Sequence, residues 1–399
     1  MGNLKVHDKL DIQAGGQAEV LDEFGSGGQG TVYKVSYNGK TYALKWYNPG
    51  VFKGKENDFY RNLENNISNG APTDAFLWPK AITKVYNDQF GYLMDVRPSG
   101  YEELTNFFVG GRKQKQARFK SFYALCTAAI NIIEAFRALH NNGYSYQDIN
   151  NGNFFINPEN GDVLICDNDN VSPFGTNLGI MGKQRWMAPE IVMGRNDPDK
   201  NSDRFSLAVV LFRLLFINHP LEGRYSTPPC MTKEAEQKYY GSAPIFVYDP
   251  STSENRPIPG TDHNLKLFWN VYPDYVKEAF IRAFSHDVMM KQKPRILEKE
   301  WLDIFIRLRT EIGRCPHCGQ ETFYTFKGNH DIPCMECSKK ISITNALQIK
   351  NQILPIFPGL KISLWTVDSS LEDIRTQVAE VVKNPNCLLY TSPSPRDAT

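Results

Sequence analysis

The segment spanning residues 144–170 constrains this chain more than any other part of its sequence. Two short apolar runs, at residues 154–156 and 163–166, flank the pair Asn160-Gly161. Asn-Gly is the strongest short-range signal for a tight hairpin, because both residues tolerate positive φ. We therefore expect two antiparallel strands here, with polar side chains grouped where the pair begins and ends.

Three polar side chains border this expected hairpin. Asp148 and Asn153 precede its first strand, and Asp167 directly follows its second strand. Carboxylate and amide oxygens are the ligands that Mg²⁺ prefers, and a carboxylate can also accept the proton of a hydroxyl group. The segment therefore has the groups needed to transfer a phosphoryl group from ATP to a hydroxyl.

The spacing from Asp148 to Asn153 resembles the catalytic loop of protein kinases, and Asp167 lies where that family has Asp-Phe-Gly. The resemblance implies that Asp148 orients and deprotonates the acceptor hydroxyl, while Asn153 and Asp167 bind Mg²⁺. Several neighbouring residues depart from the family pattern. The departures are Tyr146-Gln147 for His-Arg, Asn150 for a loop Lys, and Asn168-Asp169 for Phe-Gly.

A glycine-rich segment near the N-terminus resembles the phosphate-covering loop of the same family. Glycines let the backbone close over phosphates where side chains would block it. Because a strand-like run and not a helix follows the segment, the dinucleotide-binding pattern does not fit. The pattern within residues 19–47 is Gly25-x-Gly27-x-x-Gly30-x-Val32.

The next strand-like run, Tyr-Ala-Leu-Lys at residues 42–45, adds a cation. Strand alternation places Ala43 and Lys45 on one face, toward the nucleotide, and the other two side chains on the opposite face. The resemblance implies that Lys45 holds the α- and β-phosphates and that a helix Glu positions it. Glu64 is the best candidate, because apolar residues at 59, 63 and 67 have helical spacing around it, and Glu56 is the rival.

Two further apolar runs, at residues 75–85 and 90–96, complete an expected five-stranded small lobe. By resemblance, Met94 is the gatekeeper at the back of the adenine pocket. The hinge from Asp95 to Arg97 would meet the adenine edge through its backbone. A plain core role is the alternative interpretation of Met94.

The expected activation segment, residues 167–190, ends in Ala-Pro-Glu and resembles the corresponding kinase motif. Because Gln147 replaces the Arg that would bind an activating phosphate, we predict activity without phosphorylation of this segment. Lys183 stands where Ser/Thr kinases commonly have a Thr, and Asn150 replaces the loop Lys. We therefore hypothesise that Lys183 stabilises the transferring phosphoryl group, an exposed loop lysine being the alternative.

Residues beyond this segment have structural roles by resemblance. Asp203 is expected to brace the backbone of the catalytic loop, and Arg295 to pair with Glu190. Residues 219–263 are rich in Pro, Gly and Ser and largely lack periodicity, which predicts a surface insertion.

Two Cys-x2-Cys pairs separated by fifteen residues follow the expected kinase region. This spacing places four thiolates at the corners of a tetrahedron, with a glycine at 319 allowing a tight turn. We expect a structural zinc ribbon without catalytic activity. Its ligands are Cys315, Cys318, Cys334 and Cys337.

Composition and charge limit the class of protein. Of 399 residues, 41% are hydrophobic and 22% are charged, which is typical of a soluble globular protein. The formal net charge is +1, so the chain lacks the positive electrostatic field that would attract nucleic acid. The polar N-terminus has no signal-peptide core, and the longest apolar run, residues 207–216, is too short to cross a bilayer. We expect a cytoplasmic protein without a membrane partner.

The expected domains are a kinase-like domain at 15–310 (small lobe 15–97, large lobe 98–310), a zinc ribbon at 313–342 and a partial domain at 343–386. Residues 387–399 are interpreted as read-through of a sequencing adapter, with a disordered tail as the alternative. The fold class implied is α+β, a bilobal protein kinase-like fold followed by the ribbon and a partial segment.

The chain resembles bacterial Ser/Thr protein kinases, and is similar to those linked to a phosphatase and a von Willebrand A-type protein in tellurite-resistance-type systems. The resemblance implies transfer of the γ-phosphoryl group from ATP, with Mg²⁺, to Ser or Thr of a protein substrate. One alternative is a nucleotide-binding pseudokinase scaffold. Another is a regulator in which the ribbon docks nucleic acid or protein.

Overall fold

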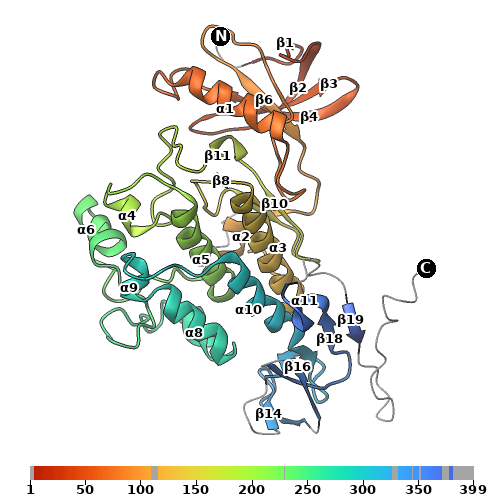
Figure 1. Ribbon diagram of the computed structural model, residues 1–399, viewed down its shortest axis with the longest axis vertical. Coiled ribbons are helices and arrows are strands. Elements are labelled where there is room, and N and C mark those ends of the chain that lie inside the picture. The colour runs from red at the N-terminus through yellow and green to blue at the C-terminus, as the bar shows by residue number, and fades with distance from the viewer. Residues whose placement is uncertain are drawn as a thin grey trace. The chain divides into compact units, whose positions relative to one another are not determined.

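A computed structural model describes residues 4–108, 116–228, 230–325, 331–343, 345–349, 352–370 and 377–380 (Figure 1). The chain forms two compact units, which are described separately. The first comprises residues 1–105, 135–157 and 163–206, and the second comprises residues 106–134, 158–162 and 207–399. These units differ from the predicted domain boundaries, because the second unit joins the C-terminal helices to the ribbon. The segment at 387–399 lies outside the described residues.

The first unit contains a six-stranded sheet in the order β1-β2-β3-β4-β6-β5, with antiparallel neighbours throughout. We predicted five strands. The sixth, β1, forms because Leu10 and Ile12 bury their side chains although the surrounding N-terminal sequence is polar. The strands are β1 (Lys9–Asp11), β2 (Gln17–Ser26), β3 (Gly30–Tyr37), β4 (Lys40–Tyr47), β5 (Ala81–Ile82) and β6 (Gly91–Asp95).

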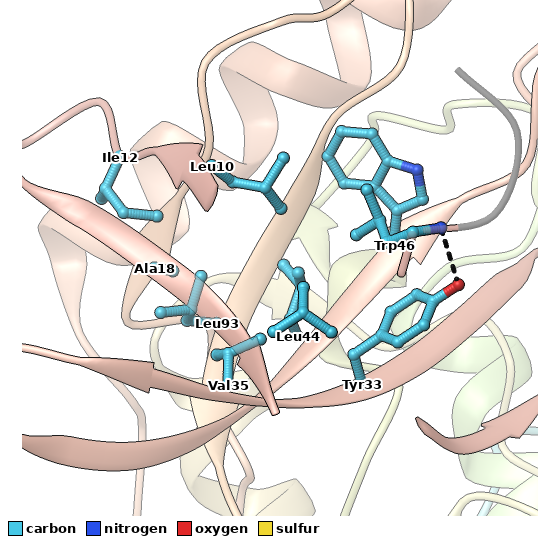
Figure 2. Close-up of a cluster of buried hydrophobic side chains, with 10 residues drawn as sticks. Leu10, Ile12, Ala18, Tyr33, Val35, Leu44, Trp46 and Leu93 are labelled. Carbon is cyan, nitrogen blue, oxygen red and sulfur yellow. Dashed lines mark hydrogen bonds between the residues drawn. The ribbon is translucent and has the colours of Figure 1, made fainter. Parts of the chain in front are cut away.

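Strand β4 separates two buried clusters, as its alternating sequence predicts. Leu44 and Trp46 pack on one face with residues of β1, β2, β3 and β6 (Figure 2). Ala43 and Tyr47 face the other cluster, which also contains Phe59 of helix α1 (Glu56–Asn69). The face that carries Ala43 therefore also carries Lys45, and the lysine lies at the edge of an apolar layer.

The rest of the first unit, which contains the residues of the predicted catalytic loop and activation segment, is built from short strands, turns and short helices. The predicted hairpin forms, because β9 and β10 are antiparallel. Its connection is longer than the expected two-residue turn, and only Gly161 of the Asn-Gly pair has positive φ, at 82°. These elements are β7 (Glu102–Glu103), β8 (Tyr144–Ser145), β9 (Phe154–Ile156), β10 (Val163–Ile165), η1 (Asn168–Asn170), β11 (Ser172–Pro173) and α4 (Pro189–Val192).

Gly161 has a packing role that the turn rule did not predict. A Cβ atom at this position would lie 2.3 Å from the carbonyl oxygen of Ala124 and 2.8 Å from the backbone nitrogen of Ala128. Both belong to helix α3 (Phe122–Asn141). The glycine is therefore required for close approach to a helix and not for a tight turn.

Three helices have residues in both units: α2 (Leu104–Phe108), α3 and α5 (Lys200–Phe216). By length and composition, α3 is the one described helix apolar enough to span a membrane, and 61% of its most apolar window is buried inside the protein. A buried apolar helix of this kind is the normal core of a globular protein.

The second unit has an aromatic core. Phe212 packs against Phe246, Phe280 and Phe284 at ring separations of 5.3–5.9 Å. Because Phe246 is 1% exposed, residues 219–263 are not the plain surface insertion that we predicted. The helical elements are α6 (Lys233–Gln237), η2 (Lys238–Ser242), α7 (His263–Trp269), α8 (Asp274–Ala283), α9 (His286–Met289), α10 (Glu298–Thr310) and α11 (Leu364–Val367).

The described strands of the second unit form four antiparallel two-stranded sheets near the C-terminus. Their contacts with helices join them to this unit. Phe122 N of α3 donates to Glu321 Oε2 at 2.6 Å. Helix α11, which directly follows β18, is held to α10 by a hydrogen bond from Trp365 Nε1 to Asp303 Oδ1 at 2.6 Å. The strands are β12 (Ile312–Arg314), β13 (Glu321–Phe323), β14 (Asp331–Pro333), β15 (Lys340–Ser342), β16 (Ala346–Ile349), β17 (Gln352–Pro355), β18 (Lys361–Ser363) and β19 (Gln377–Glu380).

Candidate active site and metal centre

The loop between β8 and β9 fixes Asp148 through neutral amides. Asn150 Nδ2 donates to Asp148 Oδ1 at 3.0 Å, and Asn153 Nδ2 donates to the backbone oxygen of Asp148 at 2.9 Å. Gly152 N in turn donates to Asn150 Oδ1 at 2.9 Å. Asn150, where the related loops have Lys, therefore orients the carboxylate without adding charge.

Asp203 supports the backbone of this loop, as predicted. Its carboxylate accepts hydrogen bonds from the backbone nitrogens of Tyr146 at 2.7 Å and Gln147 at 2.9 Å, and lies 3.2 Å from His140 Nε2. Gln147 has φ of 70°, which costs a non-glycine residue roughly 1–2 kcal/mol. The two backbone hydrogen bonds offset that cost and hold the loop in the shape that presents Asp148.

Burial tunes the acidity of Asp148. It raises the pKa of this carboxyl from 3.8 to about 6, and the negative charge of Asp167 adds to the shift. The hydrogen bonds from Asn150 and Asn153 act in the opposite direction. A carboxylate with a pKa just below neutral is suited to accept a proton and later release it.

Lys45 lies in a cluster of three oxygen-bearing side chains. Its Nζ atom is 3.0 Å from Gln29 Oε1, 3.3 Å from Asp167 Oδ1, and 3.1 and 3.0 Å from the two carboxylate oxygens of Asp169. Burial alone would lower the pKa of Lys45, but the charges of Asp167 and Asp169 outweigh it and raise the pKa. The lysine is therefore a fixed cation next to the candidate Mg²⁺ ligand Asp167.

The predicted partner of Lys45 is wrong. Among the described residues, the carboxylates paired with Lys45 are those of Asp167 and Asp169, not that of Glu64. Helix α1 instead turns Asn62 and Asn66 inward, and both side chains donate to the backbone oxygen of Val171, at 2.8 and 2.9 Å. The position at 64 is only half-buried, because the apolar and amide residues occupy the inner face of the helix.

Two tyrosines complete the cluster, and sequence reasoning missed both of them together with Asp169 and Gln29. Tyr47 OH donates to Asp169 Oδ2 at 2.6 Å, and Tyr92 OH donates to Asp169 Oδ1 at 3.3 Å. A signal was present for Tyr47, because it shares a strand face with Lys45. Burial and the nearby carboxylate raise the pKa of both phenols, which keeps them as donors.

The glycine-rich loop closes between β2 and β3. Gly27 N donates to Gly30 O at 2.8 Å. A Cβ atom at Gly30 would lie 2.2 Å from the backbone oxygen of Trp46, whereas nothing lies within 4 Å of one at Gly25. Gly30 is therefore needed for packing against β4, whereas a Cβ atom would fit at Gly25, in β2, and at Gly27, in the turn.

Three of the residues predicted to surround adenine, Val32, Ala43 and Met94, lie at one buried cluster of the first unit. Ala43 pairs with Met94 across β4 and β6, and Val32 packs against the same buried cluster. Beyond Met94, Asp95 Oδ2 forms an ion pair with Lys80 at 2.6 Å. The guanidinium of Arg97 stacks 4.0 Å above the ring of Phe155. The adenine roles of these residues remain predictions.

A cleft of about 860 Å³ joins the glycine-rich loop to the catalytic loop. Its size suits a nucleotide. Lys183 also faces this cleft, and its Nζ donates to Asn151 Oδ1 at 2.8 Å. Other lining residues include Gly28, Gln29, Lys55, Asp148, Asn150 and Asp169.

Gln147 ties the activation segment to the catalytic loop. Its Nε2 donates to Ser172 Oγ at 2.8 Å and to the backbone oxygen of Thr176 at 2.6 Å. Its Oε1 accepts from Asn177 Nδ2 at 3.0 Å. The amide thus makes neutral hydrogen bonds where the family pattern has an Arg.

The four predicted cysteine ligands form one cluster in the second unit. Their sulfur atoms lie within 4.8 Å of one another, with Cys315–Cys337 at 3.8 Å and Cys318–Cys334 at 3.7 Å. A tetrahedron with Zn–S bonds of about 2.3 Å has S–S edges of about 3.8 Å. The cluster therefore fits a closed zinc site.

The turns of the two cysteine hairpins have the same shape. Gly319 N donates to the backbone oxygen of Cys315 at 2.8 Å, and Ser338 N donates to that of Cys334 at 3.0 Å. Both turn residues have positive φ, 73° at Gly319 and 58° at Ser338. The turn at Gly319 is as predicted, while the second turn uses a serine in the same left-handed conformation, which is strained for a residue with a side chain.

Comparisons with known proteins agree with this geometry. A profile of the protein kinase domain matches residues 18–255, more than half of the chain. The chain is 25% identical over 210 residues to the probable serine/threonine-protein kinase kinX of Dictyostelium discoideum, covering 49% of this chain and 18% of that protein. It is 26% identical over 200 residues to serine/threonine-protein kinase SCH9 of Candida albicans, covering 48% of this chain and 24% of that protein.

The chain therefore spans about a quarter or less of the length of these curated relatives. Among solved structures, it is similar to the kinase domain of PknI from Mycobacterium tuberculosis, with 18% identity and a TM-score of 0.41. That similarity covers 55% of this chain and 81% of the other.

We expect Asp148→Asn to raise the melting temperature more at pH 8 than at pH 5. The folded-state pKa of about 6 exceeds the ordinary 3.8, so ionisation of Asp148 destabilises the fold by up to about 3 kcal/mol above pH 6. This cost shrinks as the pH falls toward the ordinary pKa. Thermal denaturation at both pH values measures it, with the exposed Asp74→Asn as control, and an equal change at both would contradict the prediction.

We expect the purified protein to contain about one zinc ion per chain, because four thiolates close a tetrahedral site. Removal of the metal by a chelator should lower the melting temperature of the second unit. Cys334→Ser should lose the metal, whereas Cys230→Ser, at an exposed cysteine outside the cluster, should retain it. Elemental analysis that finds well under one zinc in stable wild-type protein would refute the site.

Proposed function

Because the chain belongs to the protein kinase family, we propose that it transfers the γ-phosphoryl group of ATP to Ser or Thr hydroxyls of protein substrates. The observation that carries the proposal is that the groups needed for the reaction meet at one cleft. Asp148, with a pKa of about 6, lines the same cleft as Asp169. Asp169 in turn holds Lys45 beside Asp167. The names of the relatives, which are Ser/Thr kinases, support it.

Asp148 is proposed as the group that accepts the proton of the acceptor hydroxyl. Its carboxylate is held by Asn150 and is ionised above pH 6, so the reaction should slow as the pH falls below that value. Removal of the hydroxyl proton at this atom makes the substrate oxygen a better nucleophile.

Asn153 and Asp167 are the proposed Mg²⁺ ligands. Asn153 Nδ2 is bound to the backbone of Asp148, so its amide oxygen is the atom that can coordinate. The side chain of Asp167 is 36% exposed and is therefore accessible to a metal ion. When bound, Mg²⁺ would neutralise charge on the β- and γ-phosphate oxygens of ATP.

Lys45 and the glycine-rich loop are proposed to bind the phosphates, and the face of the β4–β6 pair that carries Ala43 and Met94 to bind adenine. Gly28 and Gln29 of the loop line the cleft, and Lys45 supplies the fixed cation. The assigned nucleotide residues are Gly25, Gly27, Gly30, Val32, Ala43, Lys45, Met94, Asp95 and Arg97.

Lys183 is proposed to stabilise the charge of the transferring phosphoryl group. It shares the cleft with Asp148, and its contact with Asn151 aligns it with the catalytic loop. The residue that replaces the loop Lys, Asn150, is neutral. A cation from the activation segment would therefore supply what the loop lacks.

The activation segment is proposed to work without phosphorylation. Gln147 already makes neutral hydrogen bonds to Ser172, Thr176 and Asn177, which order the start of the segment. An activating phosphate normally does this through new charge-assisted bonds to an Arg. Gln147 cannot form such an ion pair.

The second unit is assigned a structural role in this proposal. Zinc bound by four cysteines would stabilise the ribbon, and the divisions at 15–310, 313–342 and 343–386 remain our proposed domains. We place the protein in the cytoplasm, in a bacterial phosphorylation system with a phosphatase and a von Willebrand A-type partner.

A pseudokinase scaffold is the second candidate function. The observation that favours it is the neutral Asn150 beside Asp148, together with the altered Asn168-Asp169 sequence. Such a protein would bind nucleotide in the same cleft without transferring phosphate. Turnover separates the two functions.

We expect the wild-type protein to transfer radiolabelled phosphate from ATP to serine or threonine of casein in the presence of Mg²⁺. Asp148→Ala should lower the rate by about 100-fold or more, because it removes the proton acceptor. Asp74→Asn, at an exposed site, should keep the wild-type rate. A wild-type rate equal to that of Asp148→Ala, with nucleotide still bound, would establish the pseudokinase instead.

Phosphatase treatment of the wild type should change the rate less than about tenfold, because the activation segment is proposed to work without phosphorylation.

We expect Lys183→Ala to lower kcat about tenfold or more with little change in the KM for ATP, because the charge acts on the transition state. Lys183→Arg should keep part of the activity. The exposed Lys40→Ala serves as the control. Near wild-type turnover in Lys183→Ala would mean that Lys183 is only an exposed loop lysine.

A further inference from the structure

We propose that Asp169 is the positioning residue for Lys45, in place of a glutamate on helix α1. The inference rests on the proposed function and assigns a role to a residue that departs from the family pattern. Asp169 lies two positions after Asp167, where the family has Gly. Its carboxylate would hold the lysine in place while the lysine binds the phosphates.

The two aspartates that contact Lys45 differ in the geometry of the contact and in their exposure to solvent. Asp169 presents both carboxylate oxygens to Lys45 Nζ, at 3.1 and 3.0 Å, and its side chain is 2% exposed. Asp167 presents one oxygen at 3.3 Å, and its side chain is 36% exposed. Asp169 is thus the fixed, buried partner, and Asp167 is the partner that can turn to a metal ion.

Each carboxylate oxygen of Asp169 accepts two hydrogen bonds. Oδ1 accepts from Lys45 and Tyr92, and Oδ2 accepts from Lys45 and Tyr47. A buried carboxylate is stable only when it is paired and hydrogen-bonded in this way. These contacts leave Asp169 no freedom to release the lysine without breaking several bonds.

The sequence explains how these residues meet. Lys45 and Tyr47 share one face of β4 by strand alternation, and Tyr92 is the cross-strand neighbour of Lys45 on β6. Asp167 has φ of 53°, in the left-handed region, and the short helix η1 follows it directly. This turn leaves Asp167 partly exposed and places Asp169 against the two tyrosines.

Helix α1 is attached to the same segment by other means. Asn62 and Asn66 donate to the backbone oxygen of Val171, two residues after Asp169. These are neutral bonds to the backbone, and they do not involve Lys45. The position of Lys45 is therefore set by the segment that carries Asp167, and not by an ion pair with the helix.

The test compares Asp169→Asn with Glu64→Gln and with the exposed Asp74→Asn. Binding of a non-hydrolysable ATP analogue with Mg²⁺ is measured by calorimetry, and kcat and KM are measured with casein. We expect Asp169→Asn to weaken binding at least tenfold and to lower kcat/KM further, while Glu64→Gln and Asp74→Asn change both less than about twofold. Tyr47→Phe, which keeps the carboxylate, should show a smaller loss in the same direction.

A second measurement keeps the proposal testable if Asp169→Asn is unstable. In a double-mutant cycle with Lys45→Met, Asp169→Asn should alter analogue binding less than about twofold, because its effect acts through the lysine. In the nucleotide-free protein, Asp169→Asn should restore part of the melting temperature that Lys45→Met loses, since it removes an unpaired buried charge.

Wild-type analogue affinity in Asp169→Asn would overturn the proposal, whatever the effect of Glu64→Gln, and so would equal effects of Asp169→Asn with and without Lys45. A rise in turnover in Asp169→Asn would also overturn it, because the contact would then restrain the lysine. Absence of turnover in the wild type would refute the proposed function but not the role of Asp169. Analogue binding and the melting temperature would still measure the effect of Asp169 on Lys45.

Discussion

The buried ion pair between Lys45 and Asp169 is the interaction on which the rest of the site depends. Both side chains are almost fully excluded from water, at 6% and 2% exposure, so neither charge is stable without the other. The pair joins strand β4 to the segment that carries Asp167. In this way the cation proposed to bind phosphates and the candidate metal ligand are held in one arrangement before any nucleotide arrives.

The catalytic loop is ordered by the same physical means, a buried charge that orients backbone groups. Asp203 accepts two backbone hydrogen bonds and stabilises the left-handed conformation of Gln147. Gln147 then binds the activation segment through its amide. Neutral amides at Gln147 and Asn150 thus replace the cations of the family pattern, and the loop keeps its shape with less charge.

Local sequence predicted the parts of this site that local geometry determines. Asp148 and Asn153 lie five residues apart in one loop, and strand alternation correctly placed Ala43 and Lys45 on one face. The partner of Lys45 could not be predicted in this way. Asp169 is 124 residues away along the chain, and only the packing of η1 against the tyrosines selects it over Glu64. The aromatic core around Phe246 was missed for the same reason, because its segment lacks periodicity.

A crystal structure with Mg²⁺ and a non-hydrolysable ATP analogue tests this account most directly. We predict that Lys45 Nζ contacts an α- or β-phosphate oxygen while it remains hydrogen-bonded to Asp169, and that Asn153 and Asp167 coordinate the metal. A structure in which Lys45 leaves Asp169 and pairs with Glu64 on helix α1 would contradict the central claim.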